Sequence, residues 1–169
     1  MNKAITLNLF SKLAILSLTI IICVYCDQST KAEARSHLLG HSSISMLDNT
    51  FYLVYAENTG TMFGVGSKLP ENIRHLLFVG VVGIVLLGAI AFVLAKSLRI
   101  TTVLAVSLVV GGGIGNLIDR VIHNGSVIDF MLIKIGPIES GIFNIADIAI
   151  TFGTGLLCLI FITSTSKST

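Results

Sequence analysis

The chain has 169 residues, of which 53% are hydrophobic and 12% are charged, and its mean hydropathy is +0.91. This balance is typical of an integral membrane protein and excludes an ordinary soluble domain. The net charge of +2 gives no support for nucleic-acid binding.

Four apolar segments are each close to the roughly 20 residues that cross a bilayer as a helix. Because backbone groups in lipid must be hydrogen-bonded within the segment, these segments are predicted to be transmembrane helices. They would occupy most of the length, so we predict one integral membrane domain spanning residues 1–169. The expected spans are about 7–26, 76–95, 100–118 and 142–163, and the expected outer segments are 27–74 and 119–141.

The first apolar run follows Lys3 and contains Lys12, an arrangement that also fits a secretory signal peptide. However, Tyr25 is larger than the small residue usually found before a cleavage site, and three further spans follow. We therefore interpret the first run as a retained transmembrane helix.

The charged residues divide unevenly between the two sides of the predicted bundle, because the acidic residues share one side with six basic residues: Lys31, Arg35, Lys68, Arg74, Arg120 and Lys134. One side carries basic residues and no acidic residue, whereas the other side carries all of the acidic residues. By the positive-inside rule, the side without acidic residues faces the cytoplasm, so we predict a multi-pass protein with both termini cytoplasmic. The basic residues of that side are Lys3, Lys12, Lys96, Arg99 and Lys167.

The outer segment 27–74 is the longest stretch between spans. Within it, residues 51–55 are β-branched and aromatic, which favours a strand. Residues 57–60 are typical of a turn, and residues 45–49 are either the partner strand or the approach to it. The predicted fold class is therefore an all-α membrane protein with four transmembrane helices and a small extracytoplasmic β-sheet on the membrane surface.

Four glycines fall within five positions near the end of the third span. In membranes, small residues let helix backbones approach closely, and they would also admit a substrate backbone. Both tight helix packing and a binding role therefore remain open. These residues are Gly111, Gly112, Gly113 and Gly115.

Polar residues gather at the outer ends of three of the predicted spans, at spacings of three or four that place them on one helix face. An ordinary interfacial ion pair would explain any one group, but their common location favours one shared site. They are Asn116, Asp119 and Arg120 on the third span, Asn144 and Asp147 on the fourth, and Asp27 and Lys31 on the first.

Asp147 lies inside the apolar span 142–163 and is its only ionisable group apart from Cys158. A carboxylate at membrane depth is costly, so it is expected to face a protein interior or a wet cavity and to have a partner. The best candidate partner is Asp129, in the outer segment just upstream. Two carboxylates that lie close together cannot both ionise cheaply, so they share one proton. A shared proton favours acid–base chemistry.

Five short motifs, in this order on four predicted spans, resemble those of the bacterial lipoprotein signal peptidases (type II, or prolipoprotein, signal peptidases), and the resemblance covers nearly the whole chain. The family's second motif usually has small residues where Thr61 and Met62 stand, so we expect Met62 to reshape the rim of the pocket. The motifs are Asp27-Gln28-Ser29-Thr30-Lys31, Asn58-Thr59-Gly60-Thr61-Met62-Phe63, a segment ending in Gly115-Asn116-Leu117-Ile118-Asp119-Arg120, Val127-Ile128-Asp129-Phe130 and Phe143-Asn144-Ile145-Ala146-Asp147.

The resemblance implies an aspartic endopeptidase of the bacterial cytoplasmic (inner) membrane. Its substrates would be diacylglyceryl-modified prolipoproteins, which lose their signal peptide by a cut just before the lipidated cysteine. Asp129 and Asp147 would be the catalytic pair, and Asp119 would support them by pairing with Arg120 or another basic group. The implied substrate-binding residues are Asp27, Lys31, Asn58, Gly60, Asn116, Arg120 and Asn144.

A carboxylate pair of this kind needs no cofactor. No cluster of His, Cys and carboxylates in the sequence has the spacing of metal ligands, so no metal is expected. The expected partners are lipid-modified prolipoproteins and membrane lipid, with no nucleic acid, and we expect a monomer. Two other classes stay open: a small ion-coupled transporter that uses both aspartates as ion ligands, although no inverted repeat is detectable, and a non-catalytic membrane assembly factor.

Overall fold

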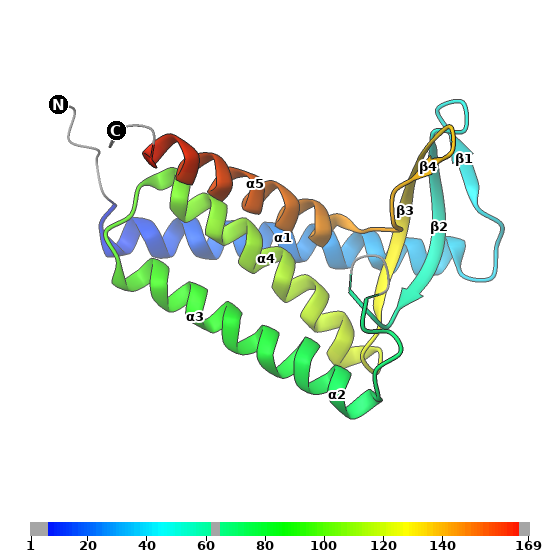
Figure 1. Cartoon of the computed structure of the whole chain (residues 1–169), viewed down its shortest axis with the longest axis horizontal. Coiled ribbons are helices and arrows are strands. Elements are labelled where there is room, and N and C mark those ends of the chain that lie inside the picture. The colour runs from blue at the N-terminus through cyan, green and yellow to red at the C-terminus, as the bar shows by residue number, and fades with distance from the viewer. Residues whose placement is uncertain (1–6, 62–64, 166–169) are drawn as a thin grey trace.

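A computed structural model describes residues 7–61 and 65–165, which form a bundle of long helices with a small sheet at one end (Figure 1). The elements, in chain order, are α1 (Leu9–Leu38), β1 (Ile44–Met46), β2 (Phe51–Asn58), α2 (Glu71–His75), the π-helix η2 (Leu76–Val81), α3 (Val82–Ala95), α4 (Ile100–Ile122), β3 (Val127–Ile135), β4 (Ile138–Glu139) and α5 (Ile145–Thr165).

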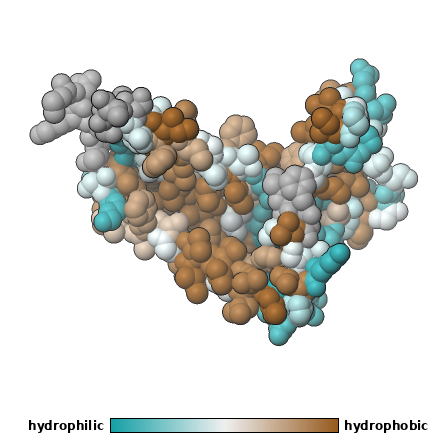
Figure 2. Space-filling view, viewed as in Figure 1, coloured by the Kyte–Doolittle hydropathy of each residue, from teal (hydrophilic) through white to brown (hydrophobic). Residues whose placement is uncertain are grey.

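Four helices in the described residues are long and apolar enough to span a membrane: α1, the continuous Glu71–Ala95 helix, α4 and α5. This confirms the predicted helical membrane fold. Hydrophobic residues cover the helical bundle, while hydrophilic residues gather around the sheet and the α2 end (Figure 2). The burial pattern is therefore that of a protein whose bundle faces lipid and whose sheet end faces water.

Helix α1 is longer than the expected span, which ended near residue 26. Buried side chains continue beyond that point at intervals of three or four residues, so one face of the helix keeps packing against the protein after the apolar run ends. The helix that carries Asp27 and Lys31 therefore continues past the predicted end of the span, through Leu38, into the segment 27–74. The buried residues of this extension are Asp27, Lys31, Ala34 and Leu38.

Helix α4 is the centre of the bundle and packs against α1, α3 and α5. Its glycines face the three neighbours in turn: a Cβ on Gly111 would lie 2.8 Å from Cβ of Cys23 on α1, and one on Gly113 would lie 2.6 Å from Cδ2 of Leu86 on α3. A Cβ on Gly112 would lie 2.4 Å from the backbone oxygen of Ala146 on α5. The glycines thus allow close packing, one of the two interpretations left open by the sequence.

The four strands form one antiparallel sheet in the order β1-β2-β3-β4. The predicted strand at 51–55 is confirmed, but it continues through Asn58, which pairs with Val127. The turn predicted at 57–60 is therefore wrong in its first two residues. Asp129 was expected in a loop and instead lies on β3, paired with Ala56, because the apolar start of β3 is buried on both faces.

Lys12 lies near the start of α1 and is only 5% exposed. Its Nζ donates to the backbone oxygens of Val93 at 3.1 Å, Leu94 at 2.7 Å and Lys96 at 3.0 Å. These carbonyls belong to the last turn of α3 and its C-cap, where a helix leaves its oxygens without internal partners. Lys12 thereby joins α1 to the end of α3 that lies opposite the sheet (Figure 1).

Candidate active site

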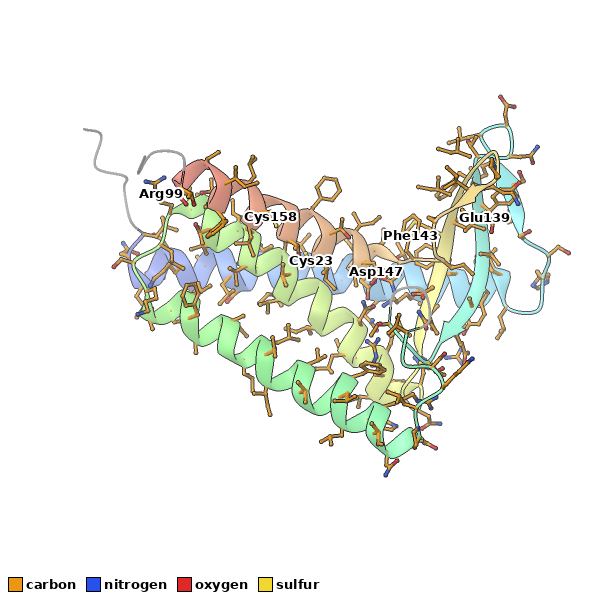
Figure 3. The ribbon with its side chains drawn as sticks, viewed as in Figure 1. Cys23, Arg99, Glu139, Phe143, Asp147 and Cys158 are labelled. Carbon is orange, nitrogen blue, oxygen red and sulfur yellow. The ribbon has the colours of Figure 1, made fainter. Side chains whose placement is uncertain are left out.

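The structure brings Asp129 and Asp147 to the wall of one pocket, which has a volume of about 360 Å³. Asp129 is on β3 and is 3% exposed, whereas Asp147 is in the first turn of α5. Figure 3 places Asp147 at the sheet end of α5, close to Phe143. The pocket therefore lies where the helical bundle meets the sheet.

Asn144 connects the two carboxylates. Its Nδ2 donates to Oδ1 of Asp129 at 2.7 Å, and its backbone N–H donates to Oδ2 of Asp147 at 3.2 Å. In return, the backbone N–H of Asp147 donates to Oδ1 of Asn144 at 2.9 Å. This exchange is the reciprocal pattern of a capping box, so the residues that start α5 also place both aspartates.

Asp129 is surrounded by groups that have opposite effects on its charge. Burial is the main cause that raises the pKa of Asp129 to about 6, and the negative charge of Asp147 also raises it. Hydrogen bonds from Asn58, whose Nδ2 lies 3.1 Å from Oδ2, and from Asn144 lower the pKa of Asp129, as does the positive charge of Lys31. The net result is a carboxyl that holds its proton at mildly acidic pH.

Helix α4 contributes an amide and a guanidinium to the pocket. Asn116 donates from Nδ2 to Oδ1 of Asp147 at 2.9 Å. Arg120 donates from Nη2 to the backbone oxygen of Gly60 at 3.0 Å, and its guanidinium lies 5.5 Å from the ring centroid of Phe78. Arg120 therefore ties α4 to the loop that follows β2.

Phe78 was not predicted as a site residue. It lies in the π-helix η2, and π-helical turns inside α-helices are frequent at functional sites because they alter which side chains face the neighbouring helix. It sits in a long uncharged run in which every residue is apolar. The sequence therefore carries no signal that would distinguish Phe78 from its lipid-facing neighbours.

Asp27, Lys31 and Asp119 were expected at or beside the pocket, and they are instead buried among α1, α4 and α5. Lys31 Nζ lies 2.7 Å from Oδ2 of Asp27 and 2.9 Å from Oδ2 of Asp119. Oδ1 of Asp27 accepts from the backbone N–H of Ala146, and Oδ2 of Asp119 accepts from that of Ile128. The basic partner of Asp119 is thus Lys31, the second of the two predicted alternatives.

The other predicted binding residues divide between the wall of the pocket and the layer behind it. Asn58, Gly60, Asn116 and Arg120 line the pocket. Asn144 is fully buried and reaches the site through its hydrogen bonds. Thr61 also lines the pocket, whereas Met62 lies outside the described residues, so its expected effect on the rim remains a prediction.

The rest of the pocket wall is largely apolar and is contributed by residues of the membrane helices and of the segment before α5. A ligand that enters from the bilayer would therefore meet apolar side chains first and the carboxylates at the sheet end. The apolar residues on this wall are Phe78, Val82, Val127, Ile142, Phe143 and Ile150.

The fold and the pocket together define an integral membrane protein with a paired-carboxylate site at the edge of its helical bundle. Comparison with known proteins is consistent with this class. The family model described as signal peptidase (SPase) II matches residues 19–163, which is most of the chain.

Two curated relatives carry the name lipoprotein signal peptidase. The one from Syntrophus aciditrophicus (strain SB) is 39% identical over 130 residues, covering 75% of this chain and 79% of the relative. The one from Clostridioides difficile (strain 630) is 33% identical over 151 residues, covering 89% of this chain and 97% of the relative. A solved structure described as a bacterial membrane enzyme has a TM-score of 0.77 and 24% identity, and covers 97% of this chain and 94% of that one, so it shares the fold.

The chain belongs to the signal peptidase II family. Family membership makes it a membrane peptidase and favours this function over the ion-coupled transporter. The family resemblance recognised in the sequence is thus confirmed, and the pocket at the sheet end is the candidate for its active site.

Proposed function

We propose that this protein is an aspartic endopeptidase that removes the signal peptide from diacylglyceryl-modified prolipoproteins, with Asp129 and Asp147 as its catalytic pair. The observation that carries the proposal is that both carboxylates line one pocket and are joined through Asn144. The raised pKa of Asp129 supports it, because a proton must reside on one member of the pair.

The reaction needs one ionised and one protonated carboxyl. The ionised member accepts a proton from water, whose oxygen forms a bond to the scissile carbonyl carbon, while the protonated member donates its proton to the carbonyl oxygen. When the tetrahedral intermediate collapses, the C–N bond breaks and the amine leaves with a proton from the first carboxyl, while the second carboxylate takes back a proton from a hydroxyl of the intermediate as the carbonyl re-forms. The protons belong to the pair, so the roles are assigned to the pair rather than to one residue.

Several neighbouring groups are suited to hold the substrate. Among the described residues, Nε of Arg120 is a buried donor without a hydrogen-bond partner, and Arg120 lines the pocket. It is the best candidate to donate to a substrate carbonyl, since an unpaired buried donor is costly until it is satisfied. Asn58 and Gly60 lie beside Arg120, which donates to the backbone oxygen of Gly60, and the backbone N–H of Gly60 donates to Oδ1 of Asn58 at 2.9 Å.

The position of the pocket suits a substrate that remains in the membrane. Its apolar wall includes Val82 and Ile150 on the membrane helices, and its carboxylates lie toward the sheet. Acyl chains and an apolar signal helix would stay in lipid while the bond before the lipidated cysteine reaches Asp129 and Asp147. Remote binding of the lipid would then position the scissile bond and raise the rate.

The location and assembly of the protein complete the proposal. Arg99 lies at the end of the bundle opposite the sheet (Figure 3), and Lys12 donates at the C-terminal end of α3 to the backbone oxygen of Lys96. The positive-inside rule supports a cytoplasmic position for that end and an outer position for the sheet, in the bacterial inner membrane. We propose that the enzyme works as a monomer, since all members of the proposed site come from one chain.

The test is cleavage of a purified lipidated precursor by the purified full-length chain. Asp129→Asn and Asp147→Asn are each expected to abolish turnover while the protein stays folded, because Asn keeps the shape of the side chain but cannot exchange the proton. Asp48→Asn, in the exposed turn after β1, is the matched control and should cleave normally. Near-normal cleavage by either site variant would refute the catalytic pair.

Two further arms of the same assay address the chemistry and the substrate. Activity is expected to survive EDTA, and loss that a single added metal restores would overturn the aspartic mechanism. The precursor without its diacylglyceryl group should turn over much more slowly than the lipidated form. Equal turnover of the two precursors would show that the lipid does not present the bond to the aspartates, and no cleavage at all would favour the assembly factor.

A further inference from the structure

Lys31 is a buried cation that the proposed reaction does not use directly. It is 2% exposed, and its Nζ lies 2.7 Å from Oδ2 of Asp27, 2.9 Å from Oδ2 of Asp119 and 3.0 Å from Oδ1 of Asn116. An ammonium group has three N–H donors and no acceptor. Lys31 donates hydrogen bonds to Asp27 and Asn116 and forms an ion pair with Asp119, so its charge is directed at these buried oxygens.

The contact with Asn116 determines how that side-chain amide is oriented. Oδ1 of Asn116 accepts from Nζ of Lys31 and from Nδ2 of Asn144 at 3.1 Å, which uses both of its lone pairs. The NH₂ group then faces Oδ1 of Asp147 at 2.9 Å. A flipped amide would place its NH₂ against two donors and its oxygen against a carboxylate, so three favourable contacts would become repulsive.

The side-chain amide of Asn144 is also held in one orientation, with its NH₂ group toward the second aspartate, Asp129. Because the backbone N–H of Asp147 holds Oδ1 of Asn144, the NH₂ group of Asn144 faces Oδ1 of Asp129 and Oδ1 of Asn116. A continuous series of hydrogen bonds therefore runs from the ammonium through two amides to both carboxylates. In such a series the orientation of each group depends on that of its neighbour.

We propose that Lys31 is a positioning residue whose ammonium holds the Asn116 amide with its NH₂ group toward Asp147. The inference rests on the proposed catalytic pair and assigns Lys31 a role other than the substrate contact implied by the family resemblance. Asp27 and Asp119 serve as counter-ions that make the buried cation tolerable and hold it in place. Without the ammonium, one of the three contacts that orient the amide is lost, so its NH₂ group is held less firmly toward Asp147.

The principal variant is Lys31→Met combined with Asp27→Asn. Removing Lys31 alone would leave two buried carboxylates without a cation, whereas the double substitution leaves one buried negative charge, as in the native group of two carboxylates and one ammonium. Asn at position 27 keeps an oxygen for the backbone N–H of Ala146. Lys31→Arg is the second variant: it keeps the charge, but its planar group does not place one nitrogen on all three oxygens.

In both variants we expect kcat for the lipidated precursor to fall about 10- to 100-fold, the loss that follows when one charge-assisted hydrogen bond to a reacting group is weakened. KM should stay within about twofold, because the pocket wall is intact. A purely structural role would instead lower the amount and thermal stability of folded enzyme without changing the kcat of the folded fraction. A native kcat in the folded variants, or a change in KM alone, would overturn the proposal.

A coupling measurement shows whether Lys31 acts through Asn116. In an Asn116→Ala background, the Lys31→Met/Asp27→Asn pair should lower kcat by less than about twofold, because the amide that Lys31 orients is already absent. An equal loss in both backgrounds would show that Lys31 acts by another route, and the proposal would fail.

Gln28→Met is the matched control for a general loss of stability around the buried charges of Lys31, Asp27 and Asp119. Gln28 donates from Nε2 to Oδ1 of Asp119 at 2.9 Å, and to Oδ2 of Asp27 and the backbone oxygen of Gly115 at 3.2 Å each, but it makes no hydrogen bond to the Asn116 side chain. Its replacement should therefore lower thermal stability but keep kcat. Asp129→Asn, purified and assayed in the same way, tests the catalytic pair separately from the positioning role of Lys31. If it still cleaves, the catalytic pair is wrong; if it is inactive while the Lys31 variants keep their kcat, only the positioning role is wrong.

Discussion

Replacement of Asp129 by Asn should abolish cleavage and at the same time stabilise the protein at neutral pH. Burial, with a contribution from Asp147, raises the pKa of Asp129 from 3.8 to about 6, so its ionisation in the folded protein costs free energy. At about 1.4 kcal/mol per pH unit, this difference corresponds to about 3 kcal/mol. Asn carries no charge and avoids that cost.

The sign of the effect depends on pH in a definite way. A carboxyl whose pKa is raised by folding contributes its full stabilisation below pH 3.8, and this contribution is lost as the pH rises through about 6. Asn also offers one acceptor fewer to Nδ2 of Asn58, which costs about 1 kcal/mol at every pH. The variant should therefore be more stable than the native chain by about 2 kcal/mol near pH 7.5 and slightly less stable near pH 4.

The assay is thermal unfolding of both purified proteins in one detergent across this pH range. For a chain of 169 residues, roughly 2–4 °C per kcal/mol predicts a Tm increase of about 4–8 °C at pH 7.5. Asp48→Asn, in the exposed turn after β1, is the control and should keep a Tm close to the native value at pH 7.5. A Tm difference for Asp129→Asn that is constant with pH, or that grows toward acid, would contradict the burial argument.

Three further predictions concern packing, capping and orientation. Gly112→Ala should lower stability by about 1–3 kcal/mol, because its Cβ would lie 2.4 Å from the backbone oxygen of Ala146, whereas Gly155→Ala, with no atom within 4 Å, should be no less stable than the native chain. Lys12→Met should destabilise by about 1–3 kcal/mol through the carbonyls of α3 that it leaves unpaired, while Lys68→Met on the exposed outer loop should have no measurable effect. A reporter fused after Thr169 should be cytoplasmic and a tag at Ser43 should be labelled from outside, and the reverse pattern would contradict the orientation.

The site shows why its members were easier to predict than its contacts. Asp147 was identified because an ionisable group inside an apolar span is rare and costly. The strand that carries Asp129 was missed although residues 127–133 are rich in β-branched and apolar side chains, since such a run next to a transmembrane helix does not by itself distinguish strand from loop. β3 exists because it pairs with β2, whose residues are far away in the sequence.

The four membrane helices, the family and the set of polar residues that gather at the sheet end of the bundle could all be predicted from the sequence. These properties depend on composition, local periodicity and short motifs, which are all contained in contiguous stretches of chain. Which side chains contact one another across different helices and strands is not contained in such stretches, because it depends on how closely those helices and strands approach. The contacts of Lys31 with Asp119 and Asn116 behind the pocket could be found only from the three-dimensional structure, because they require α1 and α4 at the close separation allowed by Gly111 and Gly115.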